Sequence, residues 1–350
     1  MKKSVWIQVI VLYVLSANVQ SAVLTVSNNP SAPAQYSTVS DAIAAASVGD
    51  TIYLLGSTTT YGNITVPKRL TIMGAGYDVV GTDYNLPTTV DYVTIDSTLS
   101  GPIDGVTLVG LSCTGSITYA SGDRGYIDNV TIKRCKVNYY INVSGNNWNI
   151  INNIINGNID FGNYNTIFVA NNVFYNSILT SSNQSSVYVL NNLFLYSTYN
   201  QFSYVSNANV YNNIFYANSV AVYSSLNNVF NNNISYNTSN YTLPPSGNSG
   251  TGNLQQTDPQ FVSQSSIPAP GSGTIPITDL KNYDWRLKPA SPGKNAGTDN
   301  TDIGIYGGPY PWPGFTGMPN LPVIEKFYIK NPVTHKDSTL KIYIKARVQQ

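Results

Sequence analysis

IINNII at residues 150–155 is the first copy of the six-residue sequence motif that decides the fold. The later copies are VANNVF at 169–174, VLNNLF at 189–194, VYNNIF at 210–215 and VFNNNI at 229–234. The second asparagine of each pair recurs at intervals of 19, 20, 21 and 19 residues. This period, rich in β-branched and aromatic residues and too short for a crossover helix, predicts that each repeat is one coil of a parallel β-solenoid.

Alternation along each strand assigns the side chains that face the interior. The predicted interior columns are Trp148, Ile167, Val187 and Ala208; Ile150, Val169, Val189, Val210 and Val229; and, after a bend, Ile155, Phe174, Phe194, Phe215 and Ile234. Asparagine suits the bend because it tolerates left-handed backbone and its amide can bond the next coil. The predicted asparagine ladder is Asn153, Asn172, Asn192, Asn213 and Asn232, with Cys135 in the same position one coil earlier.

The same frame extends backward to residues 52–54, which gives about eight coils. The predicted fold class is therefore all-β, a single-stranded right-handed parallel β-helix with an N-terminal capping helix and a small C-terminal β appendage. The two cysteines fall in adjacent coils, where Cys113 aligns with Val137 and Cys135 with Leu111. This offset separates them by roughly 8 Å, beyond disulfide reach, so two buried free thiols are expected.

The N-terminal residues have the pattern of a signal peptide. Met1-Lys2-Lys3 precedes the apolar run 5–15, and small and polar residues follow to Ala22. The run is too short to cross a bilayer, which takes roughly 20 residues. We expect residues 1–22 to direct export to the periplasm, the medium or the cell surface, with no membrane span.

Two ends of the chain carry a family resemblance. The segments 36–46, 49–54 and 70–76 look like a capping helix and first coils, and Trp285-Arg286-Leu287 with 302–308 looks like a closing segment. With these features, over about residues 34–310, the chain resembles the pectin-lyase-like superfamily of right-handed parallel β-helices, in particular secreted bacterial members. The resemblance implies the fold but no single activity, because the superfamily includes lyases, hydrolases, epimerases and adhesins.

Turn-forming residues set the remaining boundaries. The predicted divisions are a β-helix with its cap at 23–242, an irregular closing segment at 243–317 and a small β appendage at 318–350. The closing segment is expected to pass over the last coil and return along one face. The appendage could pack on the helix, lead to a partner or belong to a longer module.

Charge is scarce and unevenly placed. The formal net charge of +1 gives no electrostatic footprint for nucleic acid. From Phe161 to Thr257 there is no Asp, Glu, Lys, Arg or His, so these coils lack the acids, bases and metal ligands on which known β-helix chemistry depends. No metal or cofactor is expected, and Ca²⁺ only if the protein is a lyase.

Charged residues gather instead in an early coil. Asp123, Arg124, Asp128, Lys133 and Arg134 fall close together, with Lys136 at the end of the group. They are the candidate catalytic residues of an anionic-sugar or lyase-like site. The alternative is a solvated charged turn.

Outward positions of the repeats suggest binding. Tyr175, Tyr188, Tyr211 and Tyr216 are the candidate glycan-binding residues, because rings with hydroxyls suit sugar faces. Outward apolar residues beside the ladder, such as Ile154, Val173, Leu193 and Ile214, indicate a contacting face or one covered by the segment from Trp285 to Trp312.

The leading hypothesis is a non-catalytic, secreted or surface-associated β-helix that binds a glycan, such as a polysaccharide or surface glycan, or another cell-surface component. The alternatives are a polysaccharide lyase or glycoside hydrolase acting from the charged coil, and a structural adhesin-like spacer. The sequence indicates no oligomeric state.

Overall fold

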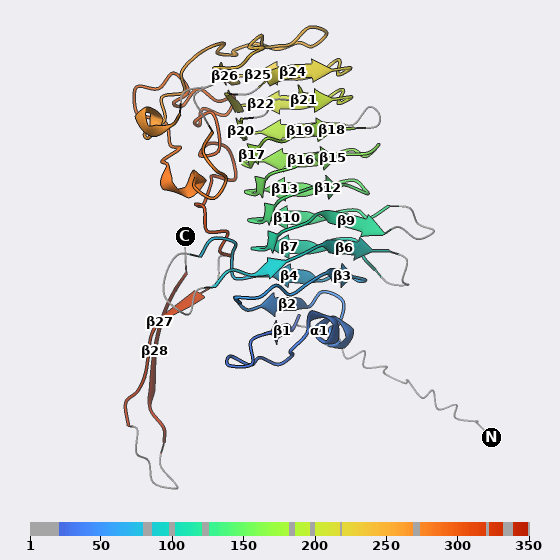
Figure 1. Ribbon diagram of the computed structural model, residues 1–350, viewed down its shortest axis with the longest axis vertical. Coiled ribbons are helices and arrows are strands. Elements are labelled where there is room, and N and C mark those ends of the chain that lie inside the picture. Colours follow the sequence, from blue (N-terminus) through green and yellow to red (C-terminus); the bar gives the residue numbers. More distant parts are fainter. Residues whose placement is uncertain are drawn as a thin grey trace, which may run out of the picture.

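The chain is a parallel β-solenoid of about eight coils in the computed structural model (Figure 1). The structure describes residues 21–79, 86–97, 102–120, 126–181, 186–196, 200–217, 219–268, 274–319, 322–331 and 339–348. Three parallel sheets run along the stack, and in each of them neighbouring strands come from successive coils. This architecture confirms the predicted fold class.

Each coil contributes one short strand to each sheet in turn. Sheet A holds β1 (Val23–Val26), β2 (Thr51–Leu54), β4 (Thr71–Met73), β7 (Thr107–Val109), β10 (Thr131–Lys133), β13 (Asn149–Ile151), β16 (Ile167–Ala170), β19 (Val187–Leu190), β22 (Asn209–Tyr211) and β25 (Val229–Asn231). Sheet B holds β3 (Ile64–Val66), β6 (Val93–Asp96), β9 (Ile117–Ala120), β12 (Ile141–Asn142), β15 (Ile159–Asp160), β18 (Leu179–Thr180), β21 (Asn200–Ser203) and β24 (Ser219–Tyr223). Sheet C holds β5 (Thr89–Val90), β8 (Ser112–Cys113), β11 (Lys136–Val137), β14 (Ile154–Ile155), β17 (Val173–Tyr175), β20 (Leu193–Leu195), β23 (Ile214–Tyr216) and β26 (Ile234–Tyr236).

Like residues stack on like in the interior. The rings of Phe174, Phe194 and Phe215 lie nearly parallel, with centroids 4.7 and 4.8 Å apart. Trp148 is fully buried, and its indole N–H donates to the carbonyl of Ile127 at 2.7 Å. Stacked aromatic pairs add about 1 kcal/mol each beyond the area they bury, so the phenylalanine column strengthens the centre of the stack.

The last repeat differs from its prediction by one residue. The register pairs Val210 with Phe230 and Phe215 with Ser235. Phe230 and Ser235, rather than Val229 and Ile234, therefore occupy the interior, and the ladder continues at Asn233 rather than Asn232. The physical reason is the third consecutive asparagine in this copy, which allows the ladder to continue at either of two positions. The alignment shifted by one residue is adopted because it places a phenylalanine in the core.

An inner rung of the asparagine ladder uses both amide hydrogens and both lone pairs of its side chain. The Nδ2 of Asn172 donates to the Oδ1 of Asn192 at 3.1 Å and to the carbonyl of Ile150 at 2.8 Å. Its Oδ1 accepts the backbone and side-chain N–H groups of Asn153. The pattern starts below at the backbone N–H of Cys135, as predicted for that position, and ends at Asn253. Coil stacking thus continues beyond residue 242.

The structure contains the predicted capping helix and the two predicted free thiols. The helix α1 (Val39–Ala45) begins after Thr38, whose hydroxyl accepts the backbone N–H of Asp41 at 3.2 Å. Its buried side chains join the core and close the first coil. Cys113 and Cys135 are buried free cysteines, and burial raises the pKa of the Cys135 thiol to about 12.

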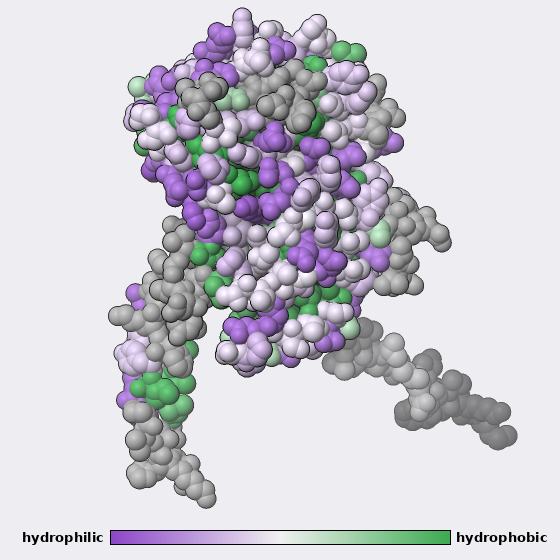
Figure 2. All heavy atoms as spheres, viewed as in Figure 1, coloured by the Kyte–Doolittle hydropathy of each residue, from purple (hydrophilic) through white to green (hydrophobic). Residues whose placement is uncertain are grey.

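The closing segment packs on the outer face of sheet C. It contains the 3₁₀ turns η1 (Gln264–Ser266) and η2 (Leu280–Asn282). A second hydrophobic cluster joins Ile154, Val173, Leu193 and Ile214 to Trp285, Ile305 and Trp312. The closing segment therefore covers these outward apolar residues of sheet C, which was one of the two predicted outcomes for them. Figure 2 shows only small apolar patches on the visible face of the coils and closing segment.

The C-terminal hairpin lies apart from the coils. The antiparallel hairpin of β27 (Pro322–Ile329) and β28 (Ile342–Val348) points away from the stack in Figure 1. Residues 1–20 of the predicted signal peptide lie outside the described residues. Among the helices of the described part, none has the length and hydropathy required to traverse a bilayer.

Candidate functional site

The first asparagine of each pair fastens the closing segment to the coils. Its backbone is left-handed in every copy, with φ between +52° and +60°, which turns its side chain outward. The amide donors and their acceptors are Asn232 to Ala296 O, Asn212 to Thr298 Oγ1, Asn191 to Asp302 O and Gly304 O, Asn171 to Ile305 O and Gly307 O, and Asn152 to Tyr310 O. The segment therefore runs from the last coil back toward the first.

Arg134 continues this column of clamps. It occupies the same left-handed position, with φ of +54°, and its Nη1 donates to the carbonyl of Met318 at 2.8 Å. The clamp was not predicted from the sequence. The only sequence feature that indicates it is the pair of asparagines in each repeat. One amide of the pair bonds within the ladder, and the other bonds the closing segment.

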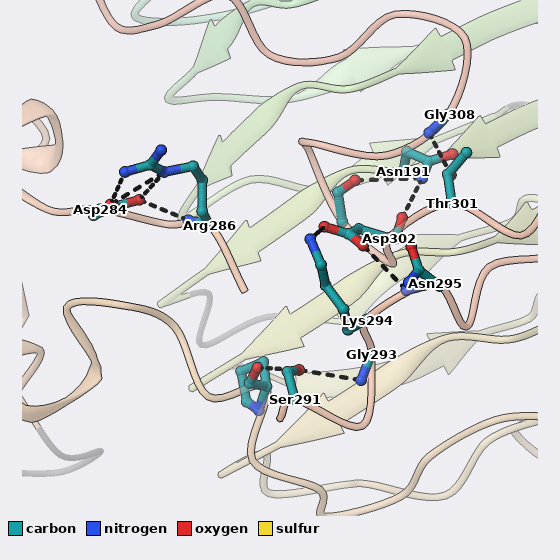
Figure 3. A network of polar contacts seen from close by, with 12 residues as sticks. Asn191, Asp284, Arg286, Ser291, Gly293, Lys294, Asn295, Thr301, Asp302 and Gly308 are labelled. Carbon is teal, nitrogen blue, oxygen red and sulfur yellow. Dashed lines mark hydrogen bonds and ion pairs between the residues drawn. The ribbon is translucent and has the colours of Figure 1, made fainter. Parts of the chain in front are cut away.

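The turn that holds Asp302 organises the clamped segment (Figure 3). The Asp302 carboxylate pairs with Lys294 at 2.7 Å and accepts the backbone N–H of Asn295 at 3.0 Å. The hydroxyl of Thr301 accepts the N–H of Gly308 at 2.7 Å. These contacts give Asp302 a structural role in the closing segment.

The predicted charged cluster is divided by the structure. Asp123 and Arg124 lie outside the described residues. The Asp128 carboxylate accepts the backbone N–H of Asn146 at 2.7 Å, while its own N–H donates to the Asp104 carboxylate at 2.9 Å. Asp128 is thus a rung that ties successive coils together. Lys133 and Arg134 line a pocket to which Asp128 does not contribute.

Lys133 shares the outer face of sheet A with two of the predicted tyrosines. The register carries its column upward through Ile151, Ala170 and Leu190 to Tyr211. Tyr188 stands in the neighbouring column beside Phe168.

Lys133 and Arg134 line a pocket of about 490 Å³, which Tyr310 and Pro319 of the closing segment also line.

The four predicted tyrosines of the repeats lie on two different faces of the coils. The ring of Tyr188 stacks on Phe168 with centroids 4.7 Å apart, so one of its faces is covered. The hydroxyl of Tyr211 donates to Asn209 at 2.8 Å. Tyr175 and Tyr216 face the closing segment instead, and Tyr216 is 1% exposed, with its hydroxyl bonded to Gln264 at 3.0 Å. Tyr216 is therefore inaccessible to a ligand.

A wider cleft opens within the closing segment, and sequence reasoning missed it. Its volume is about 800 Å³, and we call it the Tyr306 cleft. The lining residues are Asp78, Lys281, Asn282, Tyr283, Asp284, Arg286, Tyr306, Trp312, Pro313, Gly314, Phe315 and Thr316. Asp78 follows the early strand β4, and its carboxylate pairs with Lys281 at 2.7 Å. The cleft thus joins parts of the chain that are 203 residues apart.

Two titratable groups of the cleft, Asp284 and Tyr306, have shifted pKa values. Hydrogen bonding from Arg286 lowers the pKa of the Asp284 carboxyl, which keeps it ionised. Burial, helped by the negative charge of Asp284, raises the pKa of the Tyr306 phenol to about 12. Neither shift moves a pKa toward neutrality, where general acids and bases are most effective. The arrangement offers aromatic surface, fixed charges and a neutral hydroxyl to a ligand.

The fold defines the class of this protein, a parallel β-solenoid, which by itself specifies no activity. No protein-family model and no curated protein matches the chain. Across the described ranges, no group of three or more His, Cys, Asp or Glu residues is placed to hold a metal ion.

Proposed function

We propose that this protein is an exported, non-catalytic β-helix of the pectin-lyase-like kind that binds glycan through the Tyr306 cleft. The observation that carries the proposal is the lining of the cleft, where Tyr283, Tyr306, Trp312 and Phe315 stand beside two ion pairs. A sugar ring has apolar faces and a rim of hydroxyls. Aromatic side chains with a few fixed polar groups are the kind of lining that holds such a molecule in one orientation.

The volume of the cleft supports the same proposal. About 800 Å³ lies within the range of roughly 300–1,000 Å³ typical of small-molecule sites. It has room for a short oligosaccharide. The clamped asparagines hold the cleft walls against the coils, so the site is formed before a ligand arrives.

A second candidate function is a polysaccharide lyase acting at the pocket of Lys133 and Arg134. It is favoured by the two cationic side chains on the outer face of sheet A, where the pocket lining includes no carboxylate. A cationic pocket of this kind attracts an anionic chain. In this function a lysine or arginine would act as the base.

A glycan array and a polysaccharide degradation assay with the full chain test both functions. Tyr306→Ala should abolish glycan capture, and Tyr188→Ala, on sheet A, is the matched control that should retain it. Capture that persists in Tyr306→Ala and disappears in Tyr188→Ala would move the site to sheet A. Degradation that requires Lys133 would replace the binding proposal with the lyase.

A further inference from the structure

Lys136 stands out in the apolar column that the closing segment covers. The register of sheet C places it level with Ser112 and Ile154, and the column continues through Val173 and Leu193. Lysine is among the residues least often buried without a partner. The Lys136 side chain is half-buried and forms no hydrogen bond or ion pair with the described part of the chain.

A small pocket lies around this ammonium group. Its volume is about 210 Å³, and Tyr77, Asp78, Lys136, Ile154, Ile277, Thr278, Lys281 and Phe315 line it. Asp78, Lys281 and Phe315 also line the Tyr306 cleft, so the two hollows adjoin. The pocket is too small for a whole ligand, since such sites measure roughly 300 Å³ or more. It suits one substituent of a molecule bound in the cleft.

The charges of this pocket do not cancel. Asp78 already pairs with Lys281 at 2.7 Å, which leaves the positive charge of Lys136 in excess. Burial lowers the pKa of the Lys136 ammonium, and Lys281 adds to that effect while Asp78 opposes it. A charged group in such surroundings gains from an anion that enters beside it.

A neutral donor completes the lining. The hydroxyl of Tyr77 is buried and has no hydrogen-bond partner among the described residues, and the residue is 7% exposed. Burial raises the pKa of this phenol well above its usual value, so it keeps its proton. An unpaired buried hydroxyl has a desolvation cost that an acceptor oxygen would remove.

We propose that the pocket between Lys136 and Lys281 binds a singly charged oxyanion carried by the glycan in the Tyr306 cleft. The inference rests on the proposed function, and it assigns the ligand an acidic substituent. The shared chemistry is a carboxylate, sulfate-ester or phosphodiester oxygen that accepts from the Lys136 ammonium and the Tyr77 hydroxyl. The sugar ring lies in the cleft beyond Phe315.

Matched oligosaccharides test the assignment on the full chain. Neutral, carboxylated and sulfated forms of one backbone are compared by titration calorimetry. The unmodified protein should prefer an acidic form by roughly tenfold, as a charge-assisted hydrogen bond predicts. Lys136→Met should bind the neutral form normally and lose the preference, while Lys136→Arg keeps it. Lys288→Met, at an exposed lysine outside both hollows, is the control and should behave as the unmodified protein.

Inorganic anions separate the two proposals. Sulfate or acetate replaces chloride at constant ionic strength, and the thermal unfolding midpoint is measured. If the unfolding midpoint rises in the unmodified protein and rises less in Lys136→Met, the anion pocket is supported. This result would stand even if no glycan binds, and then only the proposed function fails. Glycan binding with equal affinity for neutral and acidic forms overturns the anion pocket and leaves the proposed function intact.

Discussion

The side-chain amide of Asn171 donates to the carbonyl of Gly307 at 2.7 Å, across 136 residues of sequence. Asn172, the next residue, turns the other way and bonds Asn192 inside the stack. Asn171 and Asn172 thus bond different partners, because the left-handed backbone at Asn171 reverses the direction of its side chain.

Loss of one ladder rung should weaken the whole stack. Asn172→Ala removes an amide that four backbone or side-chain groups use, and leaves those groups buried. Unsatisfied buried polar groups cost about 1–3 kcal/mol each, so a total of about 3 kcal/mol or more is expected. Denaturant unfolding measures it. A cost under 1 kcal/mol would mean that water replaces the amide.

Loss of one clamp should act locally. Asn171→Gly keeps the left-handed conformation accessible but removes both bonds to the closing segment. The expected cost is about 2 kcal/mol or less, at roughly 1 kcal/mol for each bond. Hydrogen exchange should speed up between Ile303 and Tyr310 and remain unchanged in β16 and β19. Equal acceleration in both places would show that the segment and coils open together.

The shifted register of the last coil can be tested by truncation. Phe230 is fully buried and Val229 is partly exposed. Phe230→Ala should therefore cost about 3–5 kcal/mol. Val229→Ala should cost clearly less, because it removes a smaller and less buried side chain. The two losses of unfolding free energy, compared with each other, decide the alignment. A larger loss in Val229→Ala than in Phe230→Ala would place Val229 in the interior.

The buried thiols should make stability fall in alkaline solution. Burial raises the pKa of Cys135 from 9.0 to about 12, and that of Cys113 in the same direction. The folded state therefore holds these protons more tightly, and its advantage is complete below pH 9 and disappears as pH rises toward 12. Above pH 10 buried tyrosines such as Tyr306 contribute as well.

Thiol titration and unfolding midpoints check this expectation. Between pH 9 and 10 the decline should be smaller in Cys135→Ala than in the unmodified protein. At pH 8 a thiol reagent should label neither cysteine until the protein is unfolded. Rapid labelling of the native protein would contradict the buried position of both thiols.

The sequence by itself determined the coils. Each rung of the ladder contacts a residue about 20 positions away, so Asn153, Asn172 and Asn192 show their spacing directly. The same period predicted the phenylalanine column and the alignment of Cys113 with Val137. It could not place the last rung, because three consecutive asparagines allow two alignments that differ only in which residue enters the core.

Only the tertiary structure decided the surfaces. Asp78 meets Lys281 across 203 residues, and the clamps span 64 to 184 residues. The closing segment has no repeat, so nothing in its spacing tells which coil each residue meets. Its path is set by the apolar column on sheet C, which must be covered, and by the outward amides that fix its carbonyls. That path buries Tyr216 and forms the Tyr306 cleft, and neither result can be derived from a periodicity.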